Sequence, residues 1–592
     1  MITFLGLTAL AFFTLLIGWV WRPKELPLEA QLTFLFFDGI VKSLWIGWIF
    51  VFVLATFQVT TAWVIWTLSF LTMAVAMVLT RQRKIRLQFS EWGALLGIFL
   101  LVGILAIVAF WQGIYGYDRI FGRWDALVSW NRWAIELSEN RYAPYNAAYP
   151  VLLPGLWSLV YRFQGTSEVW FFAKLSLFIQ PLMLGLFSLL LWRLRQRLIA
   201  VVFFAGSGWL LFFYMSEKNF LTGYMDGPVA VLMLLGFCSL LLVIDAVRIN
   251  NEDLLGTYLL GASLLVGLAA ITKQAGFILI VVYGAALTLL IIQKRISLRK
   301  GSIYFGFAAL PLALFVTLFL ETGRHPFGNL AVLQSLTDQS AEGYYYAIGN
   351  AIRMIGDQGG WIVVPGLIFL SLLNFLKARS LSGQIGIIGL VGAVVGLFIY
   401  ADCCAYDQRN GWWIVSLLGG SALFGLSCIV PERGVMQDEN RVSRRTCIVS
   451  VSSLFALVTI TLVLLSVIIG ALITDHRIRS MHATNQWHLV SGSWTVRDLV
   501  DRIDDKVLVV SDYRKLAYLP QKAMGKIRFC GGSTKQIEQC ILSLSRGTSV
   551  ESMFFLLSRE FEIPPGFMAL MDDDSLLEQH KYWWIYGPKS TR

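Results

Sequence analysis

Residues 224–247 read YMDGPVAVLMLLGFCSLLLVIDAV, and this stretch decides the class of fold. An α-helix needs about 20 mostly apolar residues to cross the hydrocarbon core of a bilayer, and this run supplies them. The rest of the chain repeats the pattern, because 57% of its 592 residues are hydrophobic, 14% are charged and the mean hydropathy is +0.67. The composition therefore predicts an all-α polytopic membrane protein and excludes collagen-like, disordered and disulfide-scaffold chains.

Apolar stretches bounded by charges predict about fourteen membrane spans. Their approximate bounds are 2–21, 34–58, 60–80, 91–112, 167–192, 198–215, 224–247, 254–271, 275–293, 303–321, 361–377, 384–401, 412–430 and 446–472. The first stretch has no basic region before it, which favours a retained span over a cleaved signal peptide.

Positive charges predict the orientation of the bundle. One alternating set of loops carries 20 Lys and Arg residues, about twice as many as the longer opposite set; it comprises 22–33, 81–90, 193–197, 248–253, 294–302, 377–383 and 431–445. By the positive-inside rule this set is cytoplasmic, so both termini are expected on the outer side. The net charge of +11 is then a signal of topology and not of nucleic-acid binding. The chain has no Asn-x-Ser/Thr acceptor and no retention tag, which favours a bacterial inner membrane with periplasmic termini.

The composition changes after Asp475. Residues 475–592 hold 16 basic and 14 acidic residues, which predicts a small water-soluble domain on the periplasmic side. Short apolar runs at 506–511, 527–530, 553–557 and 582–586 alternate with a helical pattern at 533–544, as in an α/β domain. Cys530 and Cys540 fall in this domain, and the sequence leaves open whether they form a disulfide.

Two expected outer loops, 113–167 and 322–360, are too long to be simple connections. In the first loop, polar residues recur at helical spacing, and an apolar stripe that includes Trp130 and Trp133 lies on the opposite face. The polar residues are Asp125, Ser129, Arg132, Glu136 and Glu139. This pattern predicts an amphipathic helix at the membrane interface, with its acidic face toward an outer vestibule. Asp125 stands at the helix start, where the dipole favours a carboxylate that can accept a proton, and where an Asp also serves as an ordinary cap.

Several motifs resemble those of the GT-C superfamily of membrane glycosyltransferases. They follow in the same order as in that superfamily and are Asp-Ala-x-x-x-Trp from Asp125, the Tyr-Pro…Pro segment 149–154, the turn 165–168, Tyr224-Met225-Asp226-Gly227-Pro228, Thr272-Lys273-Gln274-Ala275-Gly276 and Asp407-Gln408-Arg409. The resemblance covers roughly residues 91–430, within a predicted core at 91–474. The helices of residues 1–90 are additional to the usual core. Many members have paired acids in the first loop, whereas here Asp118 lies seven residues before Asp125.

The resemblance implies transfer of a sugar from a polyprenyl-phosphate carrier to a glycan, lipid or protein acceptor at the outer face, usually with inversion. Asp125 is the expected base, with Asp118 as the alternative, and Arg409 and Lys273 are expected to bind the donor phosphate. Each cation also has a possible role without a ligand. The Lys273 side chain can extend along the helix to place its ammonium at the membrane surface, and Arg409 can form an ion pair with Asp407 or Asp402. The expected supporting residues are Asp226, Arg132, Glu217, His325 and Tyr345.

No cofactor is expected, and the histidines lack the spacing of metal ligands, although a divalent cation is not excluded. Two other classes of protein also fit the pattern of predicted spans. An O-antigen ligase or polymerase would use a pyrophosphate-linked donor at the same face. A secondary transporter would show repeated halves and broken spans at matched positions, which the sequence does not show.

Overall fold

The computed structural model describes part of the chain. It comprises residues 31–56, 84–88, 126–138, 150–164, 173, 176–194, 197–214, 223–321, 341–357, 360–403, 408–429, 446–450, 507–510, 527–530, 534–545, 553–558, 576–579 and 583–587. Eight helices there are long and apolar enough to cross a membrane. The chain is therefore a mostly helical, multi-pass membrane protein, as its composition predicts.

These eight helices correspond to eight of the predicted spans. They are α2 (Gln31–Thr56), α11 (Asp226–Arg248), α12 (Glu252–Ala270), α13 (Phe277–Ile292), α14 (Leu298–Glu321), α17 (Gly360–Leu372) with its extension η6 (Leu373–Lys377), α18 (Leu381–Cys403) and α19 (Trp412–Ile429). The expected spans 167–192 and 198–215 instead contain shorter apolar helices, α8 (Ile179–Leu194) and α9 (Arg197–Gly208), the latter continued by the π-helix η4 (Trp209–Tyr214). The expected spans 2–21, 60–80 and 91–112 lie outside the described residues.

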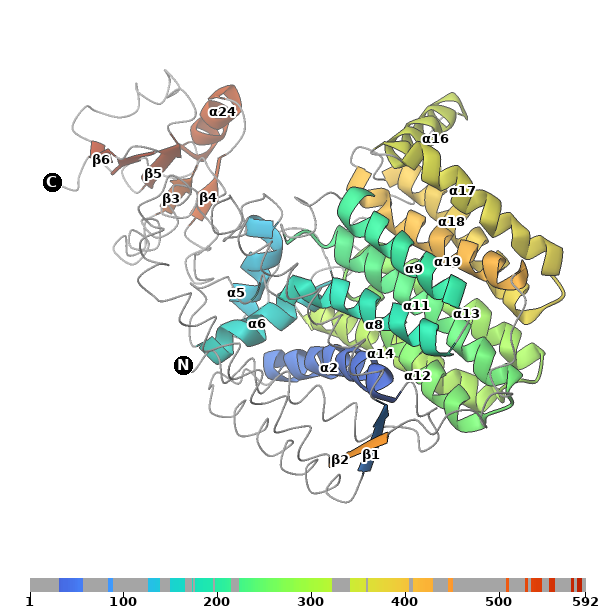
Figure 1. The fold of residues 1–592 in the computed structure, drawn as a ribbon. Coiled ribbons are helices and arrows are strands. Elements are labelled where there is room, and N and C mark those ends of the chain that lie inside the picture. The colour runs from blue at the N-terminus through green and yellow to red at the C-terminus, as the bar shows by residue number, and fades with distance from the viewer. Residues whose placement is uncertain are drawn as a thin grey trace.

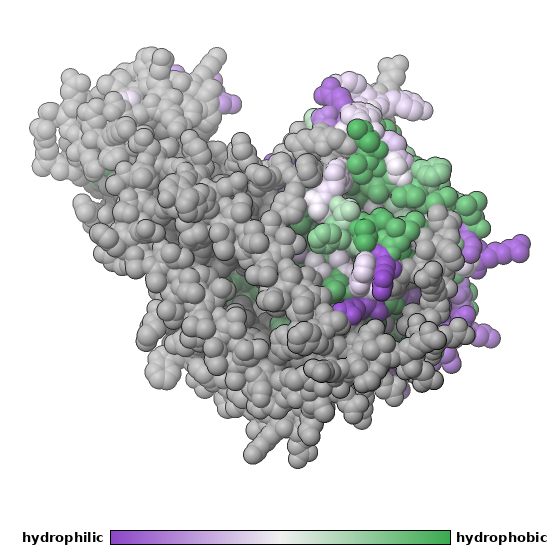
Figure 2. All heavy atoms as spheres, viewed as in Figure 1, coloured by the Kyte–Doolittle hydropathy of each residue, from purple (hydrophilic) through white to green (hydrophobic). Residues whose placement is uncertain are grey.

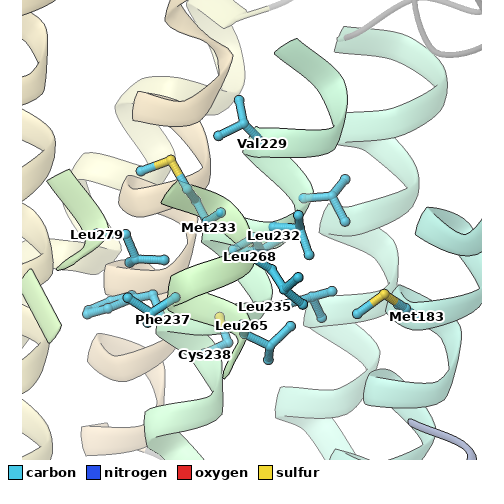
Figure 3. Packing of buried hydrophobic residues seen from close by; sticks show 14 of the residues in the cluster. Met183, Val229, Leu232, Met233, Leu235, Phe237, Cys238, Leu265, Leu268 and Leu279 are labelled. Carbon is cyan, nitrogen blue, oxygen red and sulfur yellow. The ribbon is translucent and has the colours of Figure 1, made fainter. Parts of the chain in front are cut away.

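Helix α11 is the centre of the bundle. It packs against α12, α19 and α8 and is buried over nearly its whole length, whereas α17 exposes most of its surface. Leu, Met and Phe side chains on all sides of α11 fill the space between these helices (Figure 3). Figure 1 shows α17 and α18 together at one edge of the bundle, with α19 between them and α11. A helix that is apolar all round is the type expected in such a buried position.

Glycines let the helices around α11 approach closely. A Cβ atom on Gly389 of α18 would lie 2.2 Å from the ring of Phe237, and one on Gly420 of α19 would lie 2.5 Å from it. The phenyl ring therefore occupies the space that side chains at these two positions would need.

The turn between α11 and α12 follows from its asparagines. Asn250 adopts a left-handed conformation with φ of 53°, which ends α11, and Asn251 accepts a hydrogen bond of 3.0 Å from the Leu254 amide, which caps α12. Glu252 and Asp253 lie in the first turn of α12, where the helix dipole favours acidic side chains.

Two short strands correct the expected span 446–472. Strand β2 (Thr446–Ser450) pairs antiparallel with β1 (Lys84–Gln88), so a strand and not a helix occupies the beginning of that range. The two strands come from the loop 81–90 and from the residues just after the loop 431–445. Both loops belong to the set predicted to share one side of the membrane.

The described residues after 475 form a five-stranded sheet and one helix. The sheet order is β4 (Ile527–Phe529), β3 (Val507–Val510), β5 (Met553–Ser558), β7 (Trp583–Tyr586) and β6 (Leu576–Gln579). Strand β3 is parallel to both neighbours, and β7 is antiparallel to both of its own. Helix α24 (Thr534–Ser545) packs Ile537 and Ile541 on this sheet. A disulfide joins Cys530 after β4 to Cys540 of α24, with Cα atoms 5.5 Å apart, so the pairing that the sequence leaves open is present.

Candidate functional site

Lys273 lies where the chain leaves α12 and begins α13. Its backbone is extended, and the short 3₁₀ turn η5 (Gln274–Gly276) follows it. The turn folds tightly against the end of α12, because a Cβ atom on Gly276 would lie 2.0 Å from the Ala269 carbonyl oxygen. Only glycine permits this approach. The Thr-Lys-x-x-Gly sequence therefore fixes the position of Lys273 at the helix end.

The Lys273 ammonium binds two side chains from other parts of the bundle. It forms an ion pair with Asp226 at the start of α11 and donates a hydrogen bond of 3.0 Å to Asn410 Oδ1. The Lys273 side chain is 17% exposed and that of Asp226 is 7% exposed. The structure thus brings two predicted site residues into contact. Both residues were selected from the sequence, which did not predict that Asp226 is the anion that pairs with Lys273.

Arg409 lies next to Asn410 in the 3₁₀ turn η7 (Gln408–Gly411), which leads into α19. Its guanidinium carbon lies 3.8 Å from the centre of the Tyr224 ring, which places the cation over the aromatic face. Gly223, with a φ of 89°, makes the turn that precedes Tyr224 and α11. Lys273, Asp226 and Arg409 therefore belong to one cluster, which we call the Lys273 cluster: Tyr224, Asp226, Lys273, Arg409 and Asn410.

Helix starts surround the Lys273 cluster. Helix α11 begins at Asp226, α13 begins after η5, and α19 begins after η7. Helix α6 (Leu152–Gln164) begins beside them, because the Leu152 amide donates a 2.8 Å hydrogen bond to the Ile271 carbonyl. The N-terminal end of each helix has a partial positive charge, and α11 and α13 have no side-chain cap. Together with Lys273 and Arg409, these ends favour a negatively charged ligand.

The helix of the first outer loop differs from the expected surface helix. It consists of a π-helical turn η2 (Ala126–Asn131) and α5 (Arg132–Ser138), and it packs against α6. Arg132 and Glu136 are both buried, and they form an ion pair of 2.7 Å across one helical turn. Trp130 and Trp133 are buried as well. The described residues of the polar stripe, Ser129, Arg132 and Glu136, are therefore internal, and the prediction that Arg132 and Glu136 face an open vestibule is wrong for these two residues.

Two further contacts fix this helix on α6. The Tyr161 hydroxyl hydrogen-bonds the Asn131 side chain, and the Arg162 guanidinium donates to the Leu137 carbonyl. Burial lowers the pKa of Arg162 to about 10 and raises that of Tyr161 well above the ordinary value of a tyrosine. At neutral pH Arg162 is charged and Tyr161 is neutral.

Two of the remaining predicted site residues are described, Arg132 and Tyr345, and neither belongs to the Lys273 cluster. Asp118, Asp125, Glu217 and His325 lie outside the described residues. Tyr345 belongs to α16 (Ala341–Gly356), where its side chain is 78% exposed. Among the described residues no group of three His, Cys, Asp or Glu side chains is placed to hold a metal ion.

Sequence reasoning missed two features. Asn410 was not selected, although it follows Arg409 directly, because its contact with Lys273 joins residues 137 positions apart. The second is an ion pair between Asp38 and Lys42 inside the predicted span of α2, where both residues are 2% exposed. Two opposite charges at i and i+4 within an apolar run were the available signal.

No family model, curated protein or solved structure matches this chain.

Proposed function

We propose that this protein is a membrane glycosyltransferase that moves a sugar from a polyprenyl-phosphate carrier to a hydroxyl group of a glycan, lipid or protein acceptor. The reaction takes place at the outer face of a bacterial inner membrane, with both termini in the periplasm. In this proposal residues 91–474 are the catalytic membrane core, and the sheet and helix after residue 475 belong to a small soluble domain.

One observation carries the proposal. Two cations from separate parts of the chain, Lys273 and Arg409, meet at the end of the bundle where α6, α11, α13 and α19 begin. A phosphate group attached to an apolar chain suits such a place, because its charge needs cations while its chain needs lipid.

In the proposed reaction the acceptor oxygen attacks the anomeric carbon of the donor sugar. The bond between that carbon and the phosphate oxygen breaks, and its electron pair stays on the phosphate. The acceptor proton passes to a carboxylate, for which Asp125 is our first candidate and Asp118 the second. Lys273 and Arg409 stabilise the negative charge that grows on the leaving phosphate. Attack from the side opposite the leaving group inverts the anomeric centre.

Asp226 gives the Lys273 cluster a second property. Its carboxylate neutralises Lys273 before any donor binds, which lowers the cost of keeping a cation largely buried. The donor phosphate then competes with Asp226 for the ammonium group. Asn410 holds Lys273 from another side and keeps the ammonium in place during this exchange.

The disulfide between Cys530 and Cys540 supports the proposed orientation. Disulfides persist mainly in oxidising compartments, and the periplasm is one of them. This observation is independent of the distribution of Lys and Arg in the loops, and both favour a periplasmic C-terminal region.

Sugar transfer by purified protein in proteoliposomes tests the proposal. A panel of polyprenyl-phosphate sugars is offered to the wild type and to the variants Asp125→Asn, Lys273→Met and Lys377→Met. We expect transfer by the wild type and by Lys377→Met, which changes an exposed lysine at the far end of α17, and at least a 100-fold loss in the other two. Folded wild-type protein that neither binds nor consumes any donor of the panel would refute the proposal.

One observation favours a secondary transporter as a second candidate. Asp38 and Lys42 form a buried ion pair within α2, and Asp38 Oδ1 lies 3.9 Å from the Cβ position of Gly261, midway along α12. Ionisable side chains inside a membrane often mark ion or proton pathways. Proton-driven solute uptake into proteoliposomes, lost in Asp38→Asn and retained in Lys273→Met, would favour this candidate over the enzyme.

A further inference from the structure

Helix α16 carries an unusual exposed face. Tyr345 is 78% exposed and Tyr346 is 81% exposed, and Gly349 and Ile352 continue the same face at helical spacing. Arg353, which directly follows Ile352, is exposed as well. Tyrosines with an apolar ring and a polar tip are enriched where hydrocarbon meets water. The opposite face is packed, since Ala351 and Ile355 are buried.

The packed face of α16 holds the helix at one end of the bundle. It contacts α17, α18 and the turn η7, and Ile355 lies 3.2 Å from the Cβ position of Gly411. Three candidate spans begin or end there, at Gly360, Asp402 and Arg409. Helix α16 therefore lies at the level where the neighbouring helices enter the membrane, and Figure 1 shows it beyond the ends of α17 and α18.

The exposed face continues an apolar surface on the neighbouring spans. Trp361 and Ile362 at the start of α17 are 56% and 84% exposed, and Phe398 and Ile399 near the end of α18 are exposed too. Gly356 at the end of α16 packs directly on the Trp361 ring. Figure 2 shows hydrophobic residues on this side of the bundle, below the paler residues of α16. In a membrane-spanning bundle such an outer surface contacts lipid.

We propose that α16 lies in the membrane interface and that its exposed face, Tyr345, Tyr346, Gly349 and Ile352, contacts the headgroups and upper acyl chains of the leaflet next to the Lys273 cluster. The occupant of this face is bilayer lipid, because the face is continuous with the lipid-facing side chains of α17 and α18. The inference does not depend on the proposed reaction.

The contact has a consequence for the Lys273 cluster. Ile355 packs against Gly411, and Gly411 ends the turn that carries Arg409 and Asn410. Lipid bound to one face of α16 therefore supports, through the other face, the turn that presents these two side chains.

Fluorescence quenching by lipids tests this contact. The variant Gly349→Cys is labelled with an environment-sensitive maleimide dye in proteoliposomes that contain either headgroup or mid-chain spin-labelled phosphatidylcholine. Position 349 has no atom within 4 Å of an added Cβ, so the substitution introduces no clash. Ile362→Cys serves as the lipid-facing reference and Gln536→Cys on α24 as the aqueous one. Unmodified protein, treated in the same way, gives the background from native cysteines.

We expect the label at position 349 to be quenched by the headgroup spin label at least twofold more than the label at 536, and more strongly than by the mid-chain spin label. Quenching equal to that at 536 would overturn the inference. So would blue-shifted emission without lipid quenching, since that result means that protein covers the face. In Tyr345→Ser/Tyr346→Ser we expect the quenching at 349 to fall at least twofold, and unchanged quenching would refute the role of the tyrosines.

Discussion

Lys273 is held by a carboxylate and an amide from two other helix ends, so its charge is already balanced in the protein alone. Removal of the ammonium in Lys273→Met leaves Asp226 largely buried without its cation. We expect a loss of about 1–3 kcal/mol in the free energy of unfolding, which is below the usual cost of breaking a fully buried pair because Lys273 is partly exposed. Thermal unfolding in detergent measures the change, and Lys377→Met is the matched control, expected within about 0.5 kcal/mol of the wild type.

Asp226→Asn separates the two roles of the Lys273 cluster. This variant keeps the shape of the side chain and removes the competitor for Lys273. If a phosphate ligand must displace Asp226, the variant binds inorganic phosphate or a short prenyl phosphate more tightly than the wild type, by about tenfold. Isothermal titration measures the affinity. Weaker binding in a folded Asp226→Asn protein would show that Asp226 orients Lys273 and does not compete with the ligand.

Arg409 contributes a planar group as well as a charge. Its guanidinium lies over the Tyr224 ring, and a lysine ammonium cannot reproduce that stacking. We expect Arg409→Lys to weaken phosphate binding by about tenfold, and the same change to have little further effect in a Tyr224→Leu background. Equal losses in both backgrounds, measured in a double-mutant cycle, would contradict a functional link between the two side chains.

Residue types and motif order were enough to select Lys273, Asp226 and Arg409, which the structure brings together. The partner of each charge was not predictable. The Lys273–Asp226 contact joins residues 47 positions apart, and the contact with Asn410 joins residues 137 apart. Such separations depend on how helices pack, which a local motif does not encode. For the same reason, the sequence did not separate the exposed Tyr345 from the clustered Arg409, because each was selected from its residue type and its place in an expected outer segment.

At the scale of elements, the close turn η5 sets the position of Lys273. In Gly276→Ala the new methyl group meets the Ala269 carbonyl oxygen at 2.0 Å, so the turn must move away from the end of α12. We expect a loss of about 2–3 kcal/mol in stability and a parallel loss of phosphate binding. The matched control is Gly306→Ala in α14, where nothing lies within 4 Å and alanine stabilises a helix by up to about 1 kcal/mol. A stability equal to that of the control would refute this account of the turn.

Helix α6 holds the first-loop helix through Tyr161, and this contact gives a pH dependence. Burial raises the pKa of Tyr161, so the folded protein keeps the proton after the unfolded chain has lost it. The resulting stability is complete below about pH 10 and falls above it by about 1.4 kcal/mol per pH unit. Tyr161→Phe lacks this term, and Arg162 is present in both proteins, so the difference between the two stability curves isolates Tyr161. The prediction fails if that difference is constant between pH 8 and 11.

The length of the apolar stretches predicted the eight long helices, because lipid imposes their length and composition. Periodicity was used for the first-loop helix, and there the reasoning failed. A polar stripe of period 3.6 shows that one face is polar, but it does not show what covers that face. Arg132 and Glu136 lie one turn apart and form an ion pair with each other, so these two charges could be buried together inside the protein.

At the scale of the whole molecule, the pairing of β1 with β2 brings together two segments that are about 360 residues apart in the sequence. The basic loop 81–90 contains β1, and the basic loop 431–445 leads into β2, with which β1 pairs. The count of Lys and Arg predicted that loops 81–90 and 431–445 share a side, and it predicted neither strand. The composition was less informative about residues 475–592, where it indicated alternating strands and helix but did not predict β6 or the order of the sheet.

The disulfide provides a direct test of the orientation of the whole chain. After mild reduction of spheroplasts, we expect a membrane-impermeant maleimide to label Cys540 from outside, because this side chain is partly exposed, and to label an Arg299→Cys variant only after lysis. The variant Cys530→Ser/Cys540→Ser measures the background from the remaining cysteines. It is also expected to lose about 2–3 kcal/mol locally, seen as faster proteolysis after residue 475 with unchanged cleavage of the bundle. Labelling of Arg299→Cys in intact spheroplasts, with Cys540 reached only after lysis, would reverse the orientation and place the Lys273 cluster on the cytoplasmic side.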